Sequence, residues 1–248
     1  MKLLYLFFLL ISLPTFGKEL LLTSENTVQL KGPVTRQSVG EVMQELNSLS
    51  QKGKPEDPIF LVLNTPGGSV MAGLDLMEYV NTIRRPVYAV ANYAASMGFH
   101  ILQNSPIRYV TRYATIMSHR ASGGFSGDIP QQINSRLKHV IDLIEKMDES
   151  VIARTKGKYN KESYMELIRD EYYGVGSNAI DDGFADEVVS LKCDESLNEI
   201  VEKSIQVFIF TAKVKFSRCP LITQPIVDNE ENRQQILDFL NRPRVLEP

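Results

Sequence analysis

The chain has 248 residues, of which 43% are hydrophobic and 23% are charged, and its formal net charge at pH 7 is −3. This composition is ordinary for a globular protein, and the length fits one α/β domain or one domain with an appended segment. Because the sequence has no block of like charge and no basic signature, we expect no nucleic acid partner.

The first residues have the pattern of an export signal. Lys2 precedes an apolar run over 3–13, and the small residue Gly17 stands just before Lys18. This arrangement is typical of a secretory signal peptide, here residues 1–17. The apolar run is shorter than the ~20 residues that span a bilayer. We therefore expect an exported protein, periplasmic or secreted, with membrane anchoring by an uncleaved segment as the alternative.

The chain contains two cysteines, Cys193 and Cys219. In an exported protein they can form one disulfide, and the sequence leaves this open against two unpaired thiols. Their spacing does not fit a metal site, because zinc sites need paired ligands close in sequence. We expect no metal and no other cofactor.

The first half of the chain alternates between strand and helix patterns. Thr35 is a good helix N-cap, and the continuous apolar run 59–63 is typical of a strand that is buried on both faces. The predicted order is strand 26–31, helix from Thr35, strand 59–63, helix 70–83, strand 87–91 and helix from about Ala95. Such alternation implies crossover connections and a mostly parallel sheet.

The second half begins in the same way and then changes. We predict strands at 107–111 and 114–117, a glycine-rich segment at 122–128 and a long helix from about Pro130 to Thr155. The apolar stripe of that helix is formed by Ile133, Leu137, Val140, Ile141, Ile144 and Met147. We assign 18–191 to one domain and 192–248 to a C-terminal extension of unknown role. The extension has an acidic helix candidate, a strand-like run at 205–210 that continues to Phe216, and a short amphipathic helix near 234–240.

Three short stretches carry candidate chemistry. The glycines of the turn Pro66-Gly67-Gly68 let backbone N–H groups face an open site, which suits an oxyanion. Ser96 lies at the next strand-to-helix transition, where early helical N–H groups surround its hydroxyl. His119 ends a strand, from which its ring can project into a cleft as a general base. Taken alone, each stretch is better explained by close packing or by a structural role than by catalysis.

Taken together, these stretches resemble a known family. The segments Asn64-Thr-Pro-Gly-Gly-Ser-Val70, Ala94-Ala-Ser-Met-Gly98, and Ile116-Met-Ser-His119 followed by Gly123-Gly124 are similar, in this order, to the proteolytic subunit of the Clp proteases. The similarity runs from about Val28 to Val189 and includes Ala179-Ile-Asp-Asp-Gly-Phe-Ala-Asp186. The resemblance implies an α/β fold of the Clp/crotonase group, with stacked β-α units, mostly parallel sheets and a protruding handle helix.

The resemblance also implies a serine peptidase with a catalytic triad. Ser96 matches the family's nucleophile and His119 its general base. Asp170 is the best match to the third member, with Glu171 and Asp148 as fallbacks. In such a triad the histidine takes the serine proton, and the carboxylate fixes the imidazole tautomer. The reaction proceeds through an acyl-enzyme that water releases.

Further roles follow from the same resemblance. The backbone N–H groups of Gly68 and Met97 match the family's oxyanion hole. The substrate groove is expected to be bordered by Gly67, Gly123, Gly124 and Phe125. The long helix resembles the handle that packs two rings face to face, so we expect a homo-oligomer of stacked rings.

Several features depart from the family pattern. Asn92 and Tyr93 replace the family's Gly-Gln before the serine, and Thr65 replaces a serine. Asp170 needs about one extra residue before Asp186 to match the family spacing. Clp proteolytic subunits work with an ATP-driven unfoldase, and ATP is not expected outside the cytoplasmic membrane. We therefore doubt an unfoldase partner and expect peptides or unfolded proteins as substrates.

The leading prediction is an exported, ATP-independent serine endopeptidase. One alternative is a signal-peptide-peptidase-like enzyme of the same fold with a lysine base, for which Lys138 and Lys146 are the candidates. The other alternative is a catalytically silent relative that serves as an oligomeric scaffold or binding protein.

Overall fold

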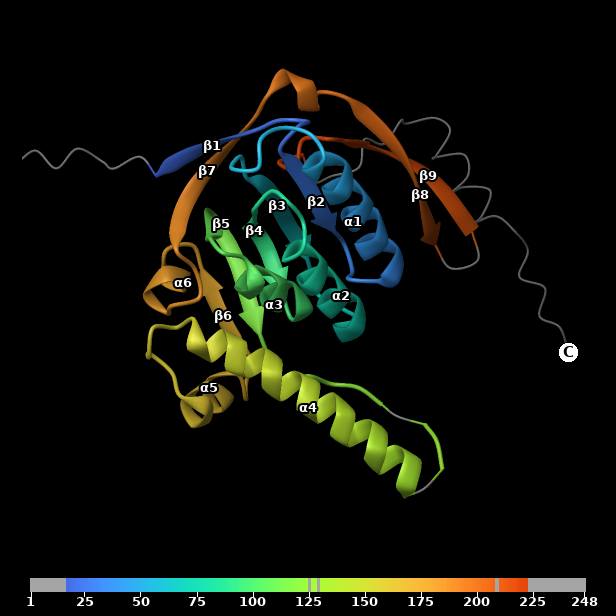
Figure 1. Ribbon diagram of the computed structural model, residues 1–248, viewed down its shortest axis with the longest axis vertical. Coiled ribbons are helices and arrows are strands. Elements are labelled where there is room, and N and C mark those ends of the chain that lie inside the picture. The colour runs from blue at the N-terminus through green and yellow to red at the C-terminus, as the bar shows by residue number, and fades with distance from the viewer. Residues whose placement is uncertain (1–16, 125, 129, 208–209, 223–248) are drawn as a thin grey trace, which may run out of the picture.

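The computed structural model shows an α/β body from which one long helix projects (Figure 1). The structure describes residues 17–124, 126–128, 130–207 and 210–222. Phe125, the predicted helix at 234–240 and all but the last residue of the predicted signal peptide lie outside the described residues. In the described ranges, no helix combines the length and the apolar content that a membrane span requires.

The main sheet has seven strands in the order β1-β7-β5-β4-β3-β2, with β6 paired to β5. All neighbours along this order are parallel, and only β6 is antiparallel to its partner. The strands are β1 Lys18–Leu22, β2 Thr27–Lys31, β3 Ile59–Thr65, β4 Val87–Ala95, β5 Arg108–Ser118, β6 Tyr172–Val175 and β7 Glu187–Cys193. This arrangement confirms the predicted fold class.

Along the chain, helices connect most of the strands of this sheet. They are α1 Arg36–Ser50, α2 Val70–Val80, α3 Met97–Asn104, α4 Gln131–Ala153, α5 Lys161–Leu167 and α6 Asn178–Asp181. Thr35 caps α1 as predicted, because its side chain accepts a hydrogen bond from the Ser38 N–H. The Ser38 hydroxyl in turn accepts from the Thr35 N–H, which completes a capping box.

At two strands of the main sheet the structure differs from the sequence predictions. The strands predicted at 107–111 and 114–117 are one strand, β5, whose pairing with β4 shifts between Ala91 and Tyr93. Arg112 and Tyr113 lie in this irregular stretch and are exposed. In the sequence they therefore look like the end of one strand and the start of another. β1 was not predicted; it is short and pairs on one side only, with β7.

The C-terminal extension forms a second, two-stranded sheet. β8 Ile200–Val207 and β9 Phe210–Ser217 are antiparallel, so the strand-like run predicted at 205–210 is divided between two strands. The acidic helix candidate is only a short 3₁₀ turn, Glu195–Leu197. A disulfide joins Cys193 at the end of β7 to Cys219 just after β9, with the two Cα atoms 5.9 Å apart.

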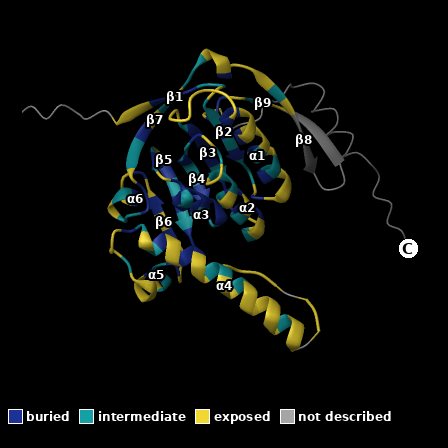
Figure 2. Ribbon diagram, in the orientation of Figure 1, coloured by how far each residue is buried: buried dark blue, intermediate teal, exposed yellow. Residues whose placement is uncertain are grey.

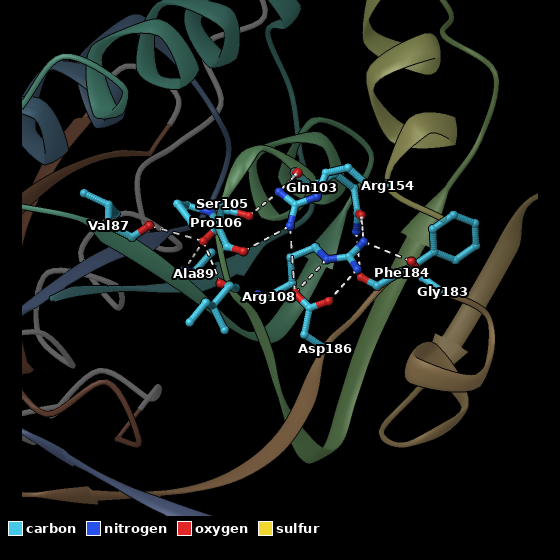
Figure 3. Close-up of polar contacts among 11 residues, drawn as sticks. Val87, Ala89, Gln103, Ser105, Pro106, Arg108, Arg154, Gly183, Phe184 and Asp186 are labelled. Atoms are coloured by element: carbon cyan, nitrogen blue, oxygen red, sulfur yellow. Dashed lines mark hydrogen bonds and ion pairs between the residues drawn. The ribbon is translucent and has the colours of Figure 1, made fainter. Parts of the chain in front are cut away.

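A polar network centred on Arg108 connects several elements of the body. Arg108 opens β5 and is only 2% exposed. Its guanidinium donates to both carboxylate oxygens of Asp186, at 2.7 and 3.0 Å (Figure 3). It also donates to Gln103 Oε1 at 2.7 Å and to the Gly183 carbonyl at 2.9 Å. Arg154 approaches the same carboxylate at 3.8 Å, so the network connects the ends of α3 and α4 to β5 and β7.

Helix α4 is largely exposed along its projecting part (Figure 2). Of the predicted apolar stripe, Met147 is buried, whereas Leu137 and Ile141 are 43% and 45% exposed. The stripe is therefore not covered by the described residues of this chain along its full length.

Candidate active site

Ser96 stands at a sharp turn between strand and helix. It follows the last residue of β4 and precedes the first residue of α3, with φ 55° and ψ −119°. A positive φ is strained for a residue with a side chain and costs of the order of 1–3 kcal/mol. The Ser96 N–H donates to the Met117 carbonyl of β5 at 2.9 Å, which fixes the turn against the neighbouring strand.

The pairing of two parallel strands brings Ser96 and His119 together. Ala95 of β4 is aligned with Met117 of β5, so the residues that follow each strand leave the sheet at the same end. His119 Nε2 lies 2.8 Å from Ser96 Oγ, within hydrogen-bond distance. When Nδ1 carries the ring proton, Nε2 accepts the hydrogen bond from the serine hydroxyl. This is the contact between nucleophile and general base that the resemblance implies.

The glycine turn packs directly against this serine. Gly67 has φ 89°, and a Cβ atom there would lie 2.6 Å from Ser96 Cβ and 2.8 Å from Met97 N. Gly98 is equally constrained, because its Cβ would lie 2.5 Å from Cγ2 of Thr65. Small residues are therefore required for β3 and α3 to approach this closely. The same packing places the turn beside the serine hydroxyl.

Two backbone donors flank the serine. Met97 is the first residue of α3, so its N–H has no acceptor within the helix. Gly68 lies in a parallel bridge with Val34, in which Val34 N–H donates to Gly67 and Ser69 N–H donates to Val34. Across the described ranges, the Gly68 N–H has no hydrogen-bond acceptor. Both donors predicted for the oxyanion hole are thus available to a ligand.

The structure does not bring Asp170 to His119. The Asp170 side chain is 76% exposed and accepts two hydrogen bonds from the neighbouring Arg169, at 2.7 and 3.1 Å. The Arg169 guanidinium holds the pKa of this carboxyl below its usual value. Glu171, one of the fallbacks, has φ 68° and accepts a hydrogen bond from the Tyr173 hydroxyl. The third member of the triad therefore stays a prediction.

A cavity of about 280 Å³ opens beside the serine and histidine. Ser96, Met97 and His119 line one side of it, and α4 and α5 line the other. Most of its wall is apolar, with contributions from Val70, Ile141, Ile144, Ile152, Met165 and Ile168. Its charged lining residues are Arg120, Glu145, Asp148, Glu149 and Lys161. Concave apolar sites with a few polar groups are typical of ligand pockets.

Two buried titratable groups line this cavity. His100 lies one turn after Ser96 in α3, and burial together with the charge of His119 lowers its pKa to about 4. Its Nδ1 is buried and has no hydrogen-bond partner in the described residues. Asp148 of α4 is 8% exposed, and burial raises the pKa of its carboxyl to about 6. His100 is therefore neutral at pH 7, and Asp148 is mostly ionised.

One protein family has both the sequence motifs and the pairing of a serine with a histidine described above. The model of the Clp protease family matches residues 18–192. The chain belongs to the Clp protease family. It is 30% identical over 172 residues to the ATP-dependent Clp protease proteolytic subunits of Streptococcus pyogenes serotype M5 (strain Manfredo) and Streptococcus equi subsp. equi (strain 4047). The aligned region covers 68% of this chain and 86% of each relative.

Membership of the Clp protease family supports a peptidase activity and makes the cavity beside Ser96 a candidate substrate pocket.

The glycines of the predicted groove differ from one another. Gly67 packs on the serine, whereas Gly123 and Gly124 are exposed, and a Cβ atom added at either would meet no other atom within 4 Å. Lys138 and Lys146, the candidates for a lysine base, are exposed on α4 and do not line the cavity.

Sequence reasoning missed the charged lining of the pocket in this Clp protease family member. Asp148 was considered only as a fallback for the triad. A signal was nevertheless present, because Asp148 follows Ile144 by four residues and therefore shares the apolar face of the long helix. A carboxylate on a buried helix face is rare unless it has a partner or a function. Lys161, in contrast, comes from a helix that the sequence pattern did not place near the site.

Proposed function

We propose that this protein is a serine endopeptidase in which Ser96 is the nucleophile and His119 the general base. The single observation that carries the proposal is the 2.8 Å contact between Ser96 Oγ and His119 Nε2 beside a cavity. Family membership supports the same chemistry.

The mechanism follows from the positions of the chain's own groups. His119 Nε2 takes the proton as Ser96 Oγ attacks the peptide carbonyl. The N–H groups of Met97 and Gly68 stabilise the oxyanion, a contribution of about 3–4 kcal/mol for each donor. His119 then gives its proton to the leaving amine, and an acyl-enzyme forms on Ser96. Water, deprotonated by the same histidine, releases the acyl group.

The strained backbone of Ser96 supports this assignment. A positive φ at a non-glycine residue persists only where the surrounding structure enforces it, and such residues cluster at functional sites. Here the Met117 carbonyl and the glycine turn hold the serine from two sides. The hydroxyl is thereby directed at His119 rather than at the start of its own helix, where it makes no capping hydrogen bond.

Labelling with a fluorophosphonate probe tests the proposal. Wild-type protein is expected to react, whereas Ser96→Ala and His119→Ala lose labelling. Ser150→Ala and His139→Ala are matched controls, because both residues are exposed on α4 and neither lines the cavity. An unlabelled wild type would support a catalytically silent scaffold. Labelling that survives His119→Ala would support a lysine base instead.

The third triad member requires its own experiment. We propose Asp170, which lies two residues before Tyr172, the β6 residue paired with Ser118 beside His119. To reach the histidine, its carboxylate has to leave Arg169. Asp170→Asn is expected to lower kcat by about 10⁴-fold, as loss of the orienting carboxylate does in other triads. A loss below about tenfold would remove Asp170 from the mechanism.

We further propose that the enzyme is exported and works without ATP. The apolar N-terminal segment and a small residue before Lys18 support export. The disulfide between Cys193 and Cys219 is of the kind that persists in oxidising compartments. Substrates would then be peptides or unfolded proteins that need no unfoldase. Cell fractionation with N-terminal sequencing of the mature protein tests this, with Lys18 as the expected first residue.

We also propose a homo-oligomer built through the projecting helix. The exposed apolar residues Leu137 and Ile141 of α4 support it, because apolar side chains on a protruding helix favour burial against another surface. Light scattering of the purified protein is expected to show an assembly. The double substitution of both residues by glutamate is expected to yield smaller particles.

A further inference from the structure

Asp148 combines three properties that distinguish it from the other carboxylates around the cavity. It is almost fully buried, with an exposed fraction of only 8%. It lines the cavity that contains Ser96 and His119. It makes no hydrogen bond and no ion pair with any residue in the described part of the chain. Its oxygens are not among the fully buried side-chain atoms that lack a partner, so they keep access to the cavity. A carboxylate that is largely withdrawn from water and has no protein partner is costly to ionise, and a cationic ligand would offset that cost.

The nearby charges leave Asp148 uncompensated. Lys161 of α5 also lines the cavity, but its ammonium donates to Glu145 at 3.1 Å and forms an ion pair with that residue. Lys161 therefore influences Asp148 only at longer range, where it partly offsets the effect of burial on the carboxyl pKa. Outside this pair, the acidic residues that line the cavity are Asp148 and Glu149, and of these only Asp148 is buried.

The remainder of the cavity wall suits an aliphatic chain. Ile144, Met147 and Ile152 of α4 face Met165 and Ile168 from the segment around α5. Lysine and arginine side chains have the complementary composition: an apolar stem that packs on aliphatic groups and a cationic end that pairs with a carboxylate. The volume of about 280 Å³ is sufficient to contain one such side chain.

We propose that Asp148 is a specificity-determining residue that selects peptides with lysine or arginine as the residue whose carbonyl Ser96 attacks. This inference rests on the proposed serine peptidase function and names its substrate class. In serine peptidases the pocket beside the nucleophile receives that side chain and sets the preference. The carboxylate forms a charge-assisted hydrogen bond with the incoming cation, in a site screened from water.

Kinetics with matched fluorogenic peptides test the proposal. The peptides differ only at the residue before the cleaved bond, which is arginine, lysine, leucine or glutamate, and kcat/KM is measured at pH 8. Wild type is expected to prefer arginine and lysine over leucine. Asp148→Asn is expected to lower the arginine-to-leucine ratio by at least about 30-fold, because truncation of one partner of a buried charge pair has effects of this size. Asp142→Asn, an exposed change of the same charge on α4, is expected to leave the ratio unchanged.

The pH dependence of the same ratio gives a second readout. The groups around the carboxyl are Glu145 and Glu149 on its own helix, Lys161 and Tyr164 on α5, and His100, His119 and Arg120 across the cavity. Since burial raises the Asp148 pKa to about 6, the arginine preference of wild type is expected to fall between pH 7 and pH 5. Dividing by the leucine rate removes the titration of the catalytic groups. In Asp148→Asn the ratio is expected to stay flat.

Each outcome separates this inference from the function on which it rests. If wild type reacts with a fluorophosphonate but cleaves the leucine peptide faster than the arginine peptide, the specificity proposal is wrong and the peptidase function stands. An arginine preference that persists in Asp148→Asn also overturns it. If wild type does not react with the probe, both proposals fall. Should Asp148→Asn not fold, competitive inhibition of wild type by benzamidine, an arginine mimic, supports the proposal, and absence of inhibition contradicts it.

Discussion

Two aspartates near opposite ends of β5 illustrate two uses of a carboxylate. Asp186 is the more exposed, with 28% of its side chain accessible, yet it accepts hydrogen bonds from Arg108 and lies near Arg154. Asp148 is the more buried, yet it has no such partner in the described residues. Burial opposes ionisation of both groups, but only at Asp186 do the arginines outweigh it and lower the pKa.

The difference separates a structural site from a binding site. In the network of Arg108, Gln103 and Asp186 the charged and polar groups pair with one another, so its main effect is to stabilise the fold. Around the cavity, the Ser96 backbone is strained, His100 Nδ1 lacks a partner and Asp148 is unpaired among the described residues. These costs are tolerated where a ligand can offset them. Substitutions on the two sides should therefore affect different properties.

The largest expected effect is on the cavity side, at Ser96. Ser96→Gly removes the hydroxyl and is expected to lower kcat by at least about 10⁴-fold. Because glycine adopts a positive φ without strain, the same change is expected to increase the free energy of unfolding by about 1 kcal/mol. Peptide hydrolysis and urea unfolding measure the two effects. Lys156→Gly, at an exposed residue with the same φ of 55°, should stabilise similarly and leave activity intact.

On the structural side, Asp186→Ala is expected to lower the free energy of unfolding by about 3–4 kcal/mol, because it leaves the buried guanidinium of Arg108 without its counter-charge. Arg108→Met should be less damaging, since it leaves a carboxylate that is partly in water and near Arg154. Urea unfolding at pH 7 measures both. The folded-state pKa of Asp186 is lowered, so its contribution is lost as the pH falls through that value. Equal effects of the two changes would contradict this account.

The next prediction concerns His100, whose pKa is lowered to about 4. Between pH 6.5 and pH 4 the unfolded chain binds a proton that the folded protein does not, so wild type loses stability as the pH falls. His100→Leu is expected to remove about 1–2 kcal/mol of that loss at pH 5 relative to pH 7. His139→Leu, at an exposed histidine of α4, should follow wild type. Thermal unfolding across this pH range distinguishes the two variants.

The smallest effect is expected at Asp148. Its folded-state pKa of about 6 lies above the unfolded value, so ionisation destabilises the fold as the pH rises from about 4 through 6. Asp148→Asn should therefore be more stable than wild type by about 1 kcal/mol at pH 8, after allowance for solvent screening, and nearly equal to it below about pH 4. Destabilisation by this change at pH 8 would mean that the carboxylate has an internal partner.

Much of the fold could be predicted from the sequence, because local and tertiary signals agree in its first half. The Thr35 cap and the buried run of β3 each determine a structure with little dependence on distant residues. β1 and the β8–β9 hairpin could not be predicted in this way. β1 is an edge strand whose identity depends on β7, which lies at the far end of the same domain in sequence. The apolar run at 205–210 reads as a single strand, whereas it overlaps the end of β8 and the start of β9, which are antiparallel.

The candidate site was predictable to the extent that its residues follow strand ends. Ser96 and His119 meet because parallel strands deliver their following residues to one edge of the sheet. The position of the Asp170 side chain depends instead on competition with Arg169, an adjacent surface residue, which no motif encodes. The environment of Asp148 depends on α3, α4 and α5 all lining the same cavity, and no local sequence pattern indicates this arrangement.

The disulfide between Cys193 and Cys219 affects how the chain responds to being cut. The two cysteines are 26 residues apart and enclose the 3₁₀ turn and both strands of the C-terminal hairpin. A single break anywhere within that loop leaves both fragments covalently joined. Cys193 also follows directly on the residues that match the Clp protease family. A nicked molecule therefore keeps its extension attached to the family domain until a reductant separates the pieces.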